Sequence, residues 1–81
     1  MKARVYVTLK KSVFDPQGHT IHDALHGMGY ASVAGVRQGK FFELDLGQVD
    51  SAELARKTAE EIAHRVLANP VIEAYRVEIE S

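Results

Sequence analysis

Apolar and polar residues alternate at both ends of this chain, and this alternation constrains its fold more than any other feature. A period of two residues is typical of a strand with one buried face. The sequence therefore predicts strands over residues 3–9 and 71–79. Their apolar positions are Ala3, Val5, Val7 and Leu9 near the start, and Val71, Tyr75, Val77 and Ile79 near the end.

A first helix is predicted from its two ends. Asp15 can accept hydrogen bonds from exposed amides as an N-cap, and Pro16 suits the first helical position. Gly29, just after Met28, offers the left-handed conformation that often ends a helix. Between these signals an apolar stripe recurs at helical spacing and is predicted to face the core. Its members are Ile21, Ala24, Leu25 and Met28.

A second, longer helix is predicted in the second half of the chain. Asp50 and Glu53 have the spacing of a capping box at its start. Asn69-Pro70 should end it, because the residue before a proline is disfavoured in the helical conformation. An apolar stripe again predicts the buried face. It consists of Leu54, Thr58, Ala59, Ile62 and Val66.

The stretch 33–46 between the helices reads as strand, interrupted by Gly35 and Gly39. A hairpin of 33–37 with 40–46, turning at Gln38-Gly39, is the favoured interpretation, and one long strand bent at Gly39 is the alternative. Phe42, Leu44 and Leu46 share one face of this strand. Phe41 lies on the other face, so it is a candidate for an interface.

Together these elements predict a single α+β domain over residues 1–81, in the order β-α-β(β)-α-β. Right-handed connections then place two helices on one face of a mainly antiparallel sheet, an arrangement that is ferredoxin-like. The opposite face has no predicted cover and is partly apolar, so a partner is expected there. Its residues include Tyr6, Thr8, Ile72, Ala74 and Arg76.

Length and composition restrict the possible functions. With 81 residues, one core is marginal and oligomerisation is a common remedy. The chain has no cysteine, which excludes disulfides and thiol chemistry, and its net charge of −1 argues against nucleic-acid binding. No apolar run is long enough to cross a membrane, and no targeting signal is recognisable. A cytoplasmic location is therefore expected.

Few residues suggest chemistry of their own. His19, His22 and His26 share one helix face, which resembles a metal site, but this face is nearly opposite the apolar stripe. We therefore predict a solvated histidine face without a functional metal. The carboxylates fall on polar faces and not in a pocket, so no catalytic residue is predicted. Arg37 and Lys40 flank Gly39 and could hold an anion, although the motif is weak.

Four blocks of the sequence, in order and over nearly the whole chain, resemble the PurS family. They are Val5-Tyr6-Val7-Thr8-Leu9-Lys10; Asp15-Pro16-Gln17-Gly18 with Ala24-Leu25 and Met28-Gly29-Tyr30; Val36-Arg37-Gln38-Gly39-Lys40-Phe41-Phe42-Glu43-Leu44; and Leu67-Ala68-Asn69-Pro70-Val71-Ile72-Glu73 with Tyr75.

The resemblance implies a PurS-like fold and a non-catalytic subunit of a three-part enzyme of purine biosynthesis, phosphoribosylformylglycinamidine synthase. In that enzyme a glutaminase subunit releases ammonia, and a large synthetase subunit uses it with ATP and magnesium. The small subunit bridges the two as a homodimer or homotetramer, with no cofactor or metal of its own. The central block suggests the partner-binding residues, which we predict to be Arg37, Gly39, Lys40 and Phe41.

Two other functions fit the same fold. A regulatory domain that binds a small molecule between paired chains would line its pocket with Gly35, Gly39 and Lys40. A small phosphate-ester enzyme would use Arg37 and Lys40 to hold the anion, but the fold alone does not support that step.

Overall fold

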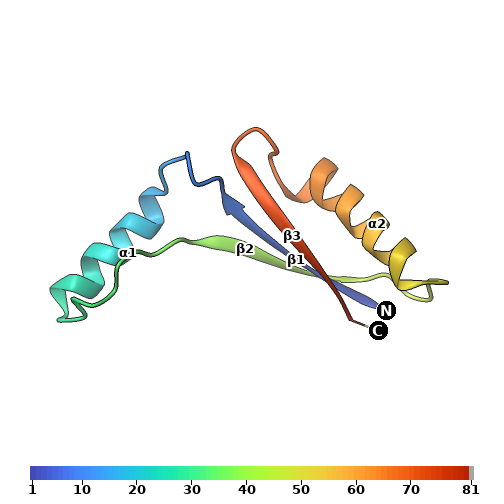
Figure 1. Ribbon diagram of the computed structural model, residues 1–81, viewed down its shortest axis with the longest axis horizontal. Helices are drawn as coiled ribbons and strands as arrows, with labels where there is room; N and C mark the ends of the chain where they lie inside the picture. Colours follow the sequence, from blue (N-terminus) through green and yellow to red (C-terminus); the bar gives the residue numbers. More distant parts are fainter. Residues whose placement is uncertain (81) are drawn as a thin grey trace.

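The computed structural model describes residues 1–80, and it confirms the predicted α+β class with a ferredoxin-like arrangement (Figure 1). Three strands form one antiparallel sheet in the order β2-β1-β3. The elements are β1 (Lys2–Leu9), α1 (Pro16–Gly27), β2 (Gly39–Asp45), α2 (Ala52–Ile62), the π-helical turn η1 (Ala63–Leu67) and β3 (Glu73–Glu80). Within this range, no helix is long and apolar enough to span a membrane.

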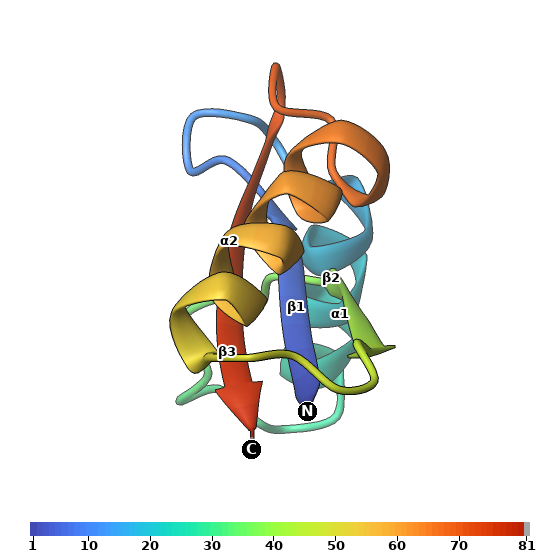
Figure 2. The ribbon, with the colours of Figure 1, turned by 90° about the vertical axis from the view of Figure 1, so that its right-hand side faces the viewer.

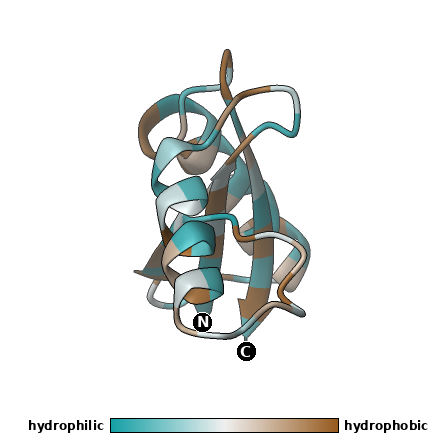
Figure 3. Cartoon of the chain, turned by 90° about the vertical axis from the view of Figure 1, so that its left-hand side faces the viewer, coloured by the Kyte–Doolittle hydropathy of each residue, from teal (hydrophilic) through white to brown (hydrophobic). Residues whose placement is uncertain are grey.

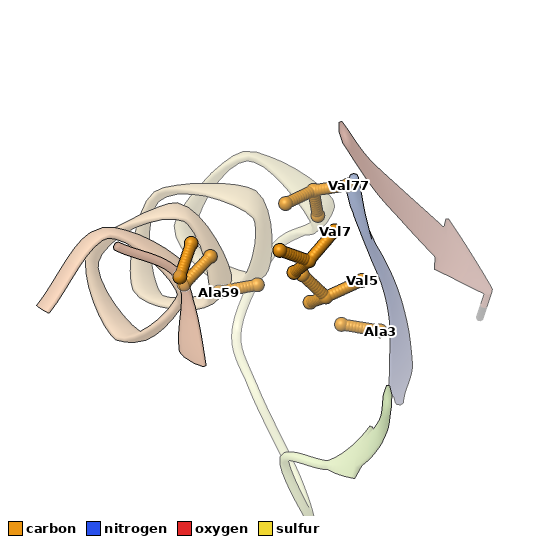
Figure 4. Packing of buried hydrophobic residues seen from close by; sticks show 7 residues of the cluster. Ala3, Val5, Val7, Ala59 and Val77 are labelled. Atoms are coloured by element: carbon orange, nitrogen blue, oxygen red, sulfur yellow. The ribbon is translucent and has the colours of Figure 1, made fainter. Parts of the chain in front are cut away.

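The core lies between α2 and one face of the sheet (Figure 4). The alternation of β1 places Ala3, Val5 and Val7 on this face, and all three are fully buried. Figure 2 shows α2 lying over the sheet, where it contacts β1 and β3. The helical side chains that cluster with these strand residues are Ala59 of α2 and Ala63 of η1, and such small side chains let the helix backbone approach the sheet closely. Both are fully buried, as is Ala55 of α2.

The buried face of the second helix differs from the predicted stripe. Ala59 is buried as predicted, but Leu54 is 46% exposed and Val66 is 76% exposed, so these two predictions were wrong. Ala55 and Ala63 are buried instead, because small alanines let the helix backbone lie close to the sheet where a larger residue would hold it away.

The second helix begins at a different cap residue from the one predicted, and it ends where the sequence predicts. Ser51, not Asp50, is the N-cap: its backbone is extended and its Oγ accepts from the amide of Leu54 at 3.1 Å. The helical path ends before Asn69, as predicted, with Ala68 already extended. Residues 69–72 form a turn, so β3 begins later than the predicted strand.

The first helix has the predicted ends but not the predicted packing. Asp15 is its N-cap and accepts from the amide of Gly18, and Gly29 has a left-handed φ of 99°. Gly18 is the one buried residue of α1. Ile21 is 40% exposed and Met28 is 72% exposed, so the prediction that this stripe faces the chain's own core was wrong. The helix extends beyond the end of the sheet, where nothing of the described chain covers the stripe (Figure 1).

The predicted hairpin is also wrong, because residues 31–38 form no strand. Instead this segment returns along α1 (Figure 3, where this end of the molecule faces the viewer). The carbonyl of Val33 bonds His26, and the amide of Gln38 donates to Asp15 at 2.9 Å. Since its polar groups bond to α1, the segment does not pair with a strand. We call residues 15–38, the helix and its returning segment, the α1 arm.

Candidate partner-binding surfaces

The sheet face opposite α2 carries a row of large side chains. Tyr6 lies between Phe41 and Arg76 in the strand register. The rings of Tyr6 and Phe41 have centroids 5.1 Å apart, and the Arg76 guanidinium lies 4.3 Å above the Tyr6 ring. Phe41 is 50% exposed, which confirms its predicted place off the core face. A partly exposed group of aromatic and arginine side chains of this kind is typical of a protein interface.

Ion pairs surround this row. Arg76 bonds Glu78, the Tyr6 hydroxyl donates to Glu78 at 3.2 Å, and Arg4 pairs with Glu80. The hydrogen bond from Arg76 lowers the pKa of Glu78, and the Tyr6 hydroxyl acts in the same direction. Exposed pairs of this type add little stability. They fix the geometry of the surface and leave it with few unpaired charges.

The four residues predicted to bind a partner do not share one face. Arg37 donates to the carbonyls of Leu9 and Lys10, so it ties the returning segment to the end of β1. A side chain at Gly39 would collide with the Val7 carbonyl, which explains the glycine by close strand packing.

The other two predicted residues point to opposite sides of β2. The Lys40 Nζ lies 3.8 Å from a Glu73 carboxylate oxygen on the side of the sheet that α2 covers, and Phe41 is on the other side. Arg37 is exposed too, but its guanidinium is already bonded to two carbonyls of its own chain. Lys40 and Phe41 are therefore the better candidates to contact a partner, and their role there remains a prediction.

Within one chain, the residues named for the two other functions line separate hollows. Gly35 and Arg37 line a hollow beside the first turn of α1, together with His19 and His22. Gly39 and Lys40 line a different, smaller hollow at the end of the sheet. The residues proposed for a small molecule or a phosphate ester are therefore split between two sites.

The stripe of α1 is a second uncovered surface, and sequence reasoning missed it. Amphipathic spacing predicts that a helix face will be covered, but it does not say by which chain.

On the sheet, the β2 side of the core face is also only partly covered, because α2 lies over β1 and β3. The half-buried residues there are Phe42, Leu44 and Leu46.

Of the three histidines, His19 and His26 are exposed as predicted, and His22 is less solvated. His22 has a side chain only 26% exposed, and the returning segment of the arm runs along this side of α1. Within residues 1–80, no three histidine, aspartate or glutamate side chains are grouped as ligands of one metal ion.

The described chain thus combines a small core with two uncovered apolar surfaces, which is typical of an interaction domain. Comparison with known proteins gives the family. The family model PurS, described as phosphoribosylformylglycinamidine (FGAM) synthase, matches residues 2–81, and the chain belongs to this family.

Similar proteins come from bacteria and archaea. The phosphoribosylformylglycinamidine synthase subunit PurS of Bacillus subtilis is 46% identical over 98% of this chain and 92% of its own length. The crystal structure of PurS from Methanocaldococcus jannaschii superposes with a TM-score of 0.87 at 35% identity, over 99% of this chain and 95% of that one. A chain in the structure of PurLQS from Thermotoga maritima gives a TM-score of 0.85 at 30% identity, over 95% and 93% of the two chains.

Proposed function

We propose that this chain is the small, non-catalytic subunit of FGAM synthase, and that it bridges a glutaminase subunit and an ATP-dependent synthetase subunit in the cytoplasm. The observation that carries the proposal is the likeness, over nearly the whole chain, to a protein in the PurLQS assembly. In this role the small subunit holds its partners so that ammonia passes from one to the other. ATP and magnesium act in the synthetase.

The side chains support a role without chemistry. Catalytic acids and bases usually depend on burial or close charge partners that shift their pKa values. Residues 1–80 contain no buried polar or charged side chain. The two carboxylates with lowered pKa, Asp15 and Glu78, are held by a helix cap and by a surface arginine, which are structural contacts. These contacts indicate that Asp15 and Glu78 stabilise the structure of the chain and do not act as catalytic groups.

The shape of the chain supports self-association. Its radius of gyration is 15.9 Å, whereas a compact domain of this length has about 12 Å. Its accessible surface is 5801 Å² for 9.0 kDa, whereas a compact monomer of this mass exposes about 4,900 Å². The excess is close to the roughly 800 Å² that each partner buries in a standard interface.

The positions of the uncovered surfaces suggest how two copies fit. No sheet packs against the α1 stripe, and no helix of the same chain fully covers the β2 side of the core face. A second copy can supply both reciprocally, with the stripe of each arm over Phe42 and Leu44 of the other sheet. This arrangement is isologous, so it closes as a homodimer. The open aromatic face then remains available for the other subunits, or for the pairing of two dimers into a homotetramer.

A reconstituted enzyme tests the bridging role. Lys40→Ala combined with Phe41→Ser should lower glutamine-dependent FGAM synthesis by about tenfold or more, because loss of interface anchors typically costs 1.4 kcal/mol or more. Synthesis driven by free ammonium should change little, because it does not require the glutaminase to be held in place.

The control is Lys57→Ala on the exposed side of α2, which should leave both activities unchanged. Arg37 is kept, because its bonds to the Leu9 and Lys10 carbonyls hold the arm. Equal loss of both activities in a double variant that still assembles would contradict the bridging role and indicate direct contact with the synthetase site.

A further inference from the structure

The histidine side of α1 contains a spacing that the proposed function does not use. His22 and His26 are four residues apart on the helix, so their side chains lie one above the other. Their ring centroids are 4.2 Å apart. Two histidines at this spacing on one helix face are a recurrent way to hold a metal ion.

The His26 ring has a partner that orients it. A carbonyl oxygen can only accept, so the 2.8 Å contact between His26 Nε2 and the Val33 carbonyl places the proton on Nε2. The lone pair of the neutral ring is then on Nδ1. For His22, Nδ1 lies 3.6 Å from an Asp23 carboxylate oxygen, which is beyond hydrogen-bond distance, so Asp23 contributes negative charge beside this ring. Metal-binding histidines commonly have such carbonyl or carboxylate partners on their other nitrogen.

We propose that His22 and His26 form a binding site for a divalent transition-metal ion of the zinc, nickel and copper group, with water completing the coordination. Imidazole nitrogen suits these ions better than magnesium or calcium. Because the Val33 carbonyl orients His26, a bound ion also braces α1 against the returning segment of the arm. The site is distinct from the aromatic face and the α1 stripe, and it does not depend on the proposed function.

The neighbouring charges limit the strength of this site. An Asp23 carboxylate oxygen also lies 3.3 Å from the Nε2 of His19, so this one carboxylate is close to two histidine rings. Lys11 and Arg37 line the adjacent hollow, where Arg37 is engaged by the Leu9 and Lys10 carbonyls. Asp15 in the same hollow is occupied by backbone amides. With one nearby carboxylate and exposed rings, we expect moderate affinity and fast exchange of the ion.

Calorimetric titration of the full chain, without a histidine tag, with Ni²⁺ and Zn²⁺ tests the proposal. We expect one ion per chain. His22→Gln and His26→Gln should each weaken binding by at least about tenfold. Asp23→Asn, which removes only a nearby negative charge, should weaken it less. Glutamine keeps a donor for the Val33 carbonyl, so the arm should stay folded.

The fourth histidine supplies a matched control. His64 packs edge-on against Tyr75, with ring centroids 6.2 Å apart, away from the cluster. His64→Gln should bind the ion as the unaltered chain does. Absence of saturable binding, equal binding by the His22→Gln and His26→Gln variants, or one ion per two chains would overturn the proposal.

Discussion

The two helices of this chain have almost equal length but are buried to very different extents. α2 presents Ala55 and Ala59 to the sheet, and both are fully buried. α1 buries only Gly18 and leaves Ile21 and Met28 largely exposed. One helix therefore builds the core of its own chain, and the other carries an apolar face that its own chain does not cover.

The difference shows what an amphipathic pattern does and does not determine. The small residues of α2 suit close packing on the valines of β1, so burial within the chain is the stable solution. The stripe of α1 has larger side chains, Ile21, Leu25 and Met28, on an arm whose other side is occupied by its own returning segment. Such a stripe needs another surface, and in the proposed dimer a second copy of the chain provides one.

The largest effect should come from a charge placed under α2. Ala59→Asp puts an unpaired carboxylate against Val5 and Val7 and should lower the free energy of unfolding by at least about 3 kcal/mol. Urea denaturation followed by circular dichroism measures this. Ala52→Asp, at an exposed position in the first turn of the same helix, should be neutral or slightly stabilising. If the two variants lost stability equally, the assignment of α2 as the core helix would fail.

The corresponding change in α1 should affect association and leave the fold of the chain intact. Each aliphatic side chain buried in an interface contributes about 1.5–3 kcal/mol, so Ile21→Ser with Leu25→Ser should raise the dimer dissociation constant by at least about 100-fold. Sedimentation velocity at several concentrations measures it.

Val66→Ser, at a 76% exposed position next to the second helix, is the control and should associate normally. A chain that sediments as a monomer of one chain mass before any substitution would contradict the self-association itself.

The sequence was sufficient for elements whose signals are local. Alternation predicted β1, and Asp15 and Gly29 predicted both ends of α1, because caps and alternation depend on neighbouring residues. The sequence was insufficient where contacts between residues far apart along the chain determine the local structure. Residues 33–37 have strand-like composition, but the Asp15 and His26 side chains hold the segment against α1. For the surfaces, alternation found Phe41, whereas the uncovered α1 stripe depends on where the arm lies.

Two glycines provide a smaller, matched test of packing in the sheet and in the α1 arm. A Cβ at Gly39 would meet the Val7 carbonyl within the sheet, so Gly39→Ala should cost about 1–3 kcal/mol. A Cβ at Gly27 in α1 has nothing within 4 Å, so Gly27→Ala should gain about 0.5–1 kcal/mol from better helix propensity. Thermal melts of the two variants should shift in opposite directions, and a shift of the same sign would mean that the arm is packed more tightly than its structure shows.

The smallest expected effect is the pH dependence of the cap that anchors the arm. The amides of Gly18 and Gln38 donate to Asp15 and lower its pKa below the ordinary value of 3.8. A carboxyl whose pKa is lowered by folding stabilises the folded chain above its unfolded pKa, and this contribution is lost as the pH falls through the folded pKa. The variant Asp15→Asn cannot ionise at the cap, so its urea midpoint should lie below that of the unaltered chain at pH 7.

The difference between the two midpoints should narrow as the pH falls below about 4, since both chains then carry a neutral group at the cap. Asp50→Asn, at the position where Ser51 serves as the cap instead, should show no such narrowing gap. A gap for Asp15→Asn that stays constant from pH 7 to pH 3 would mean that the charge of Asp15 does not hold the arm, and that the two hydrogen bonds act through geometry alone.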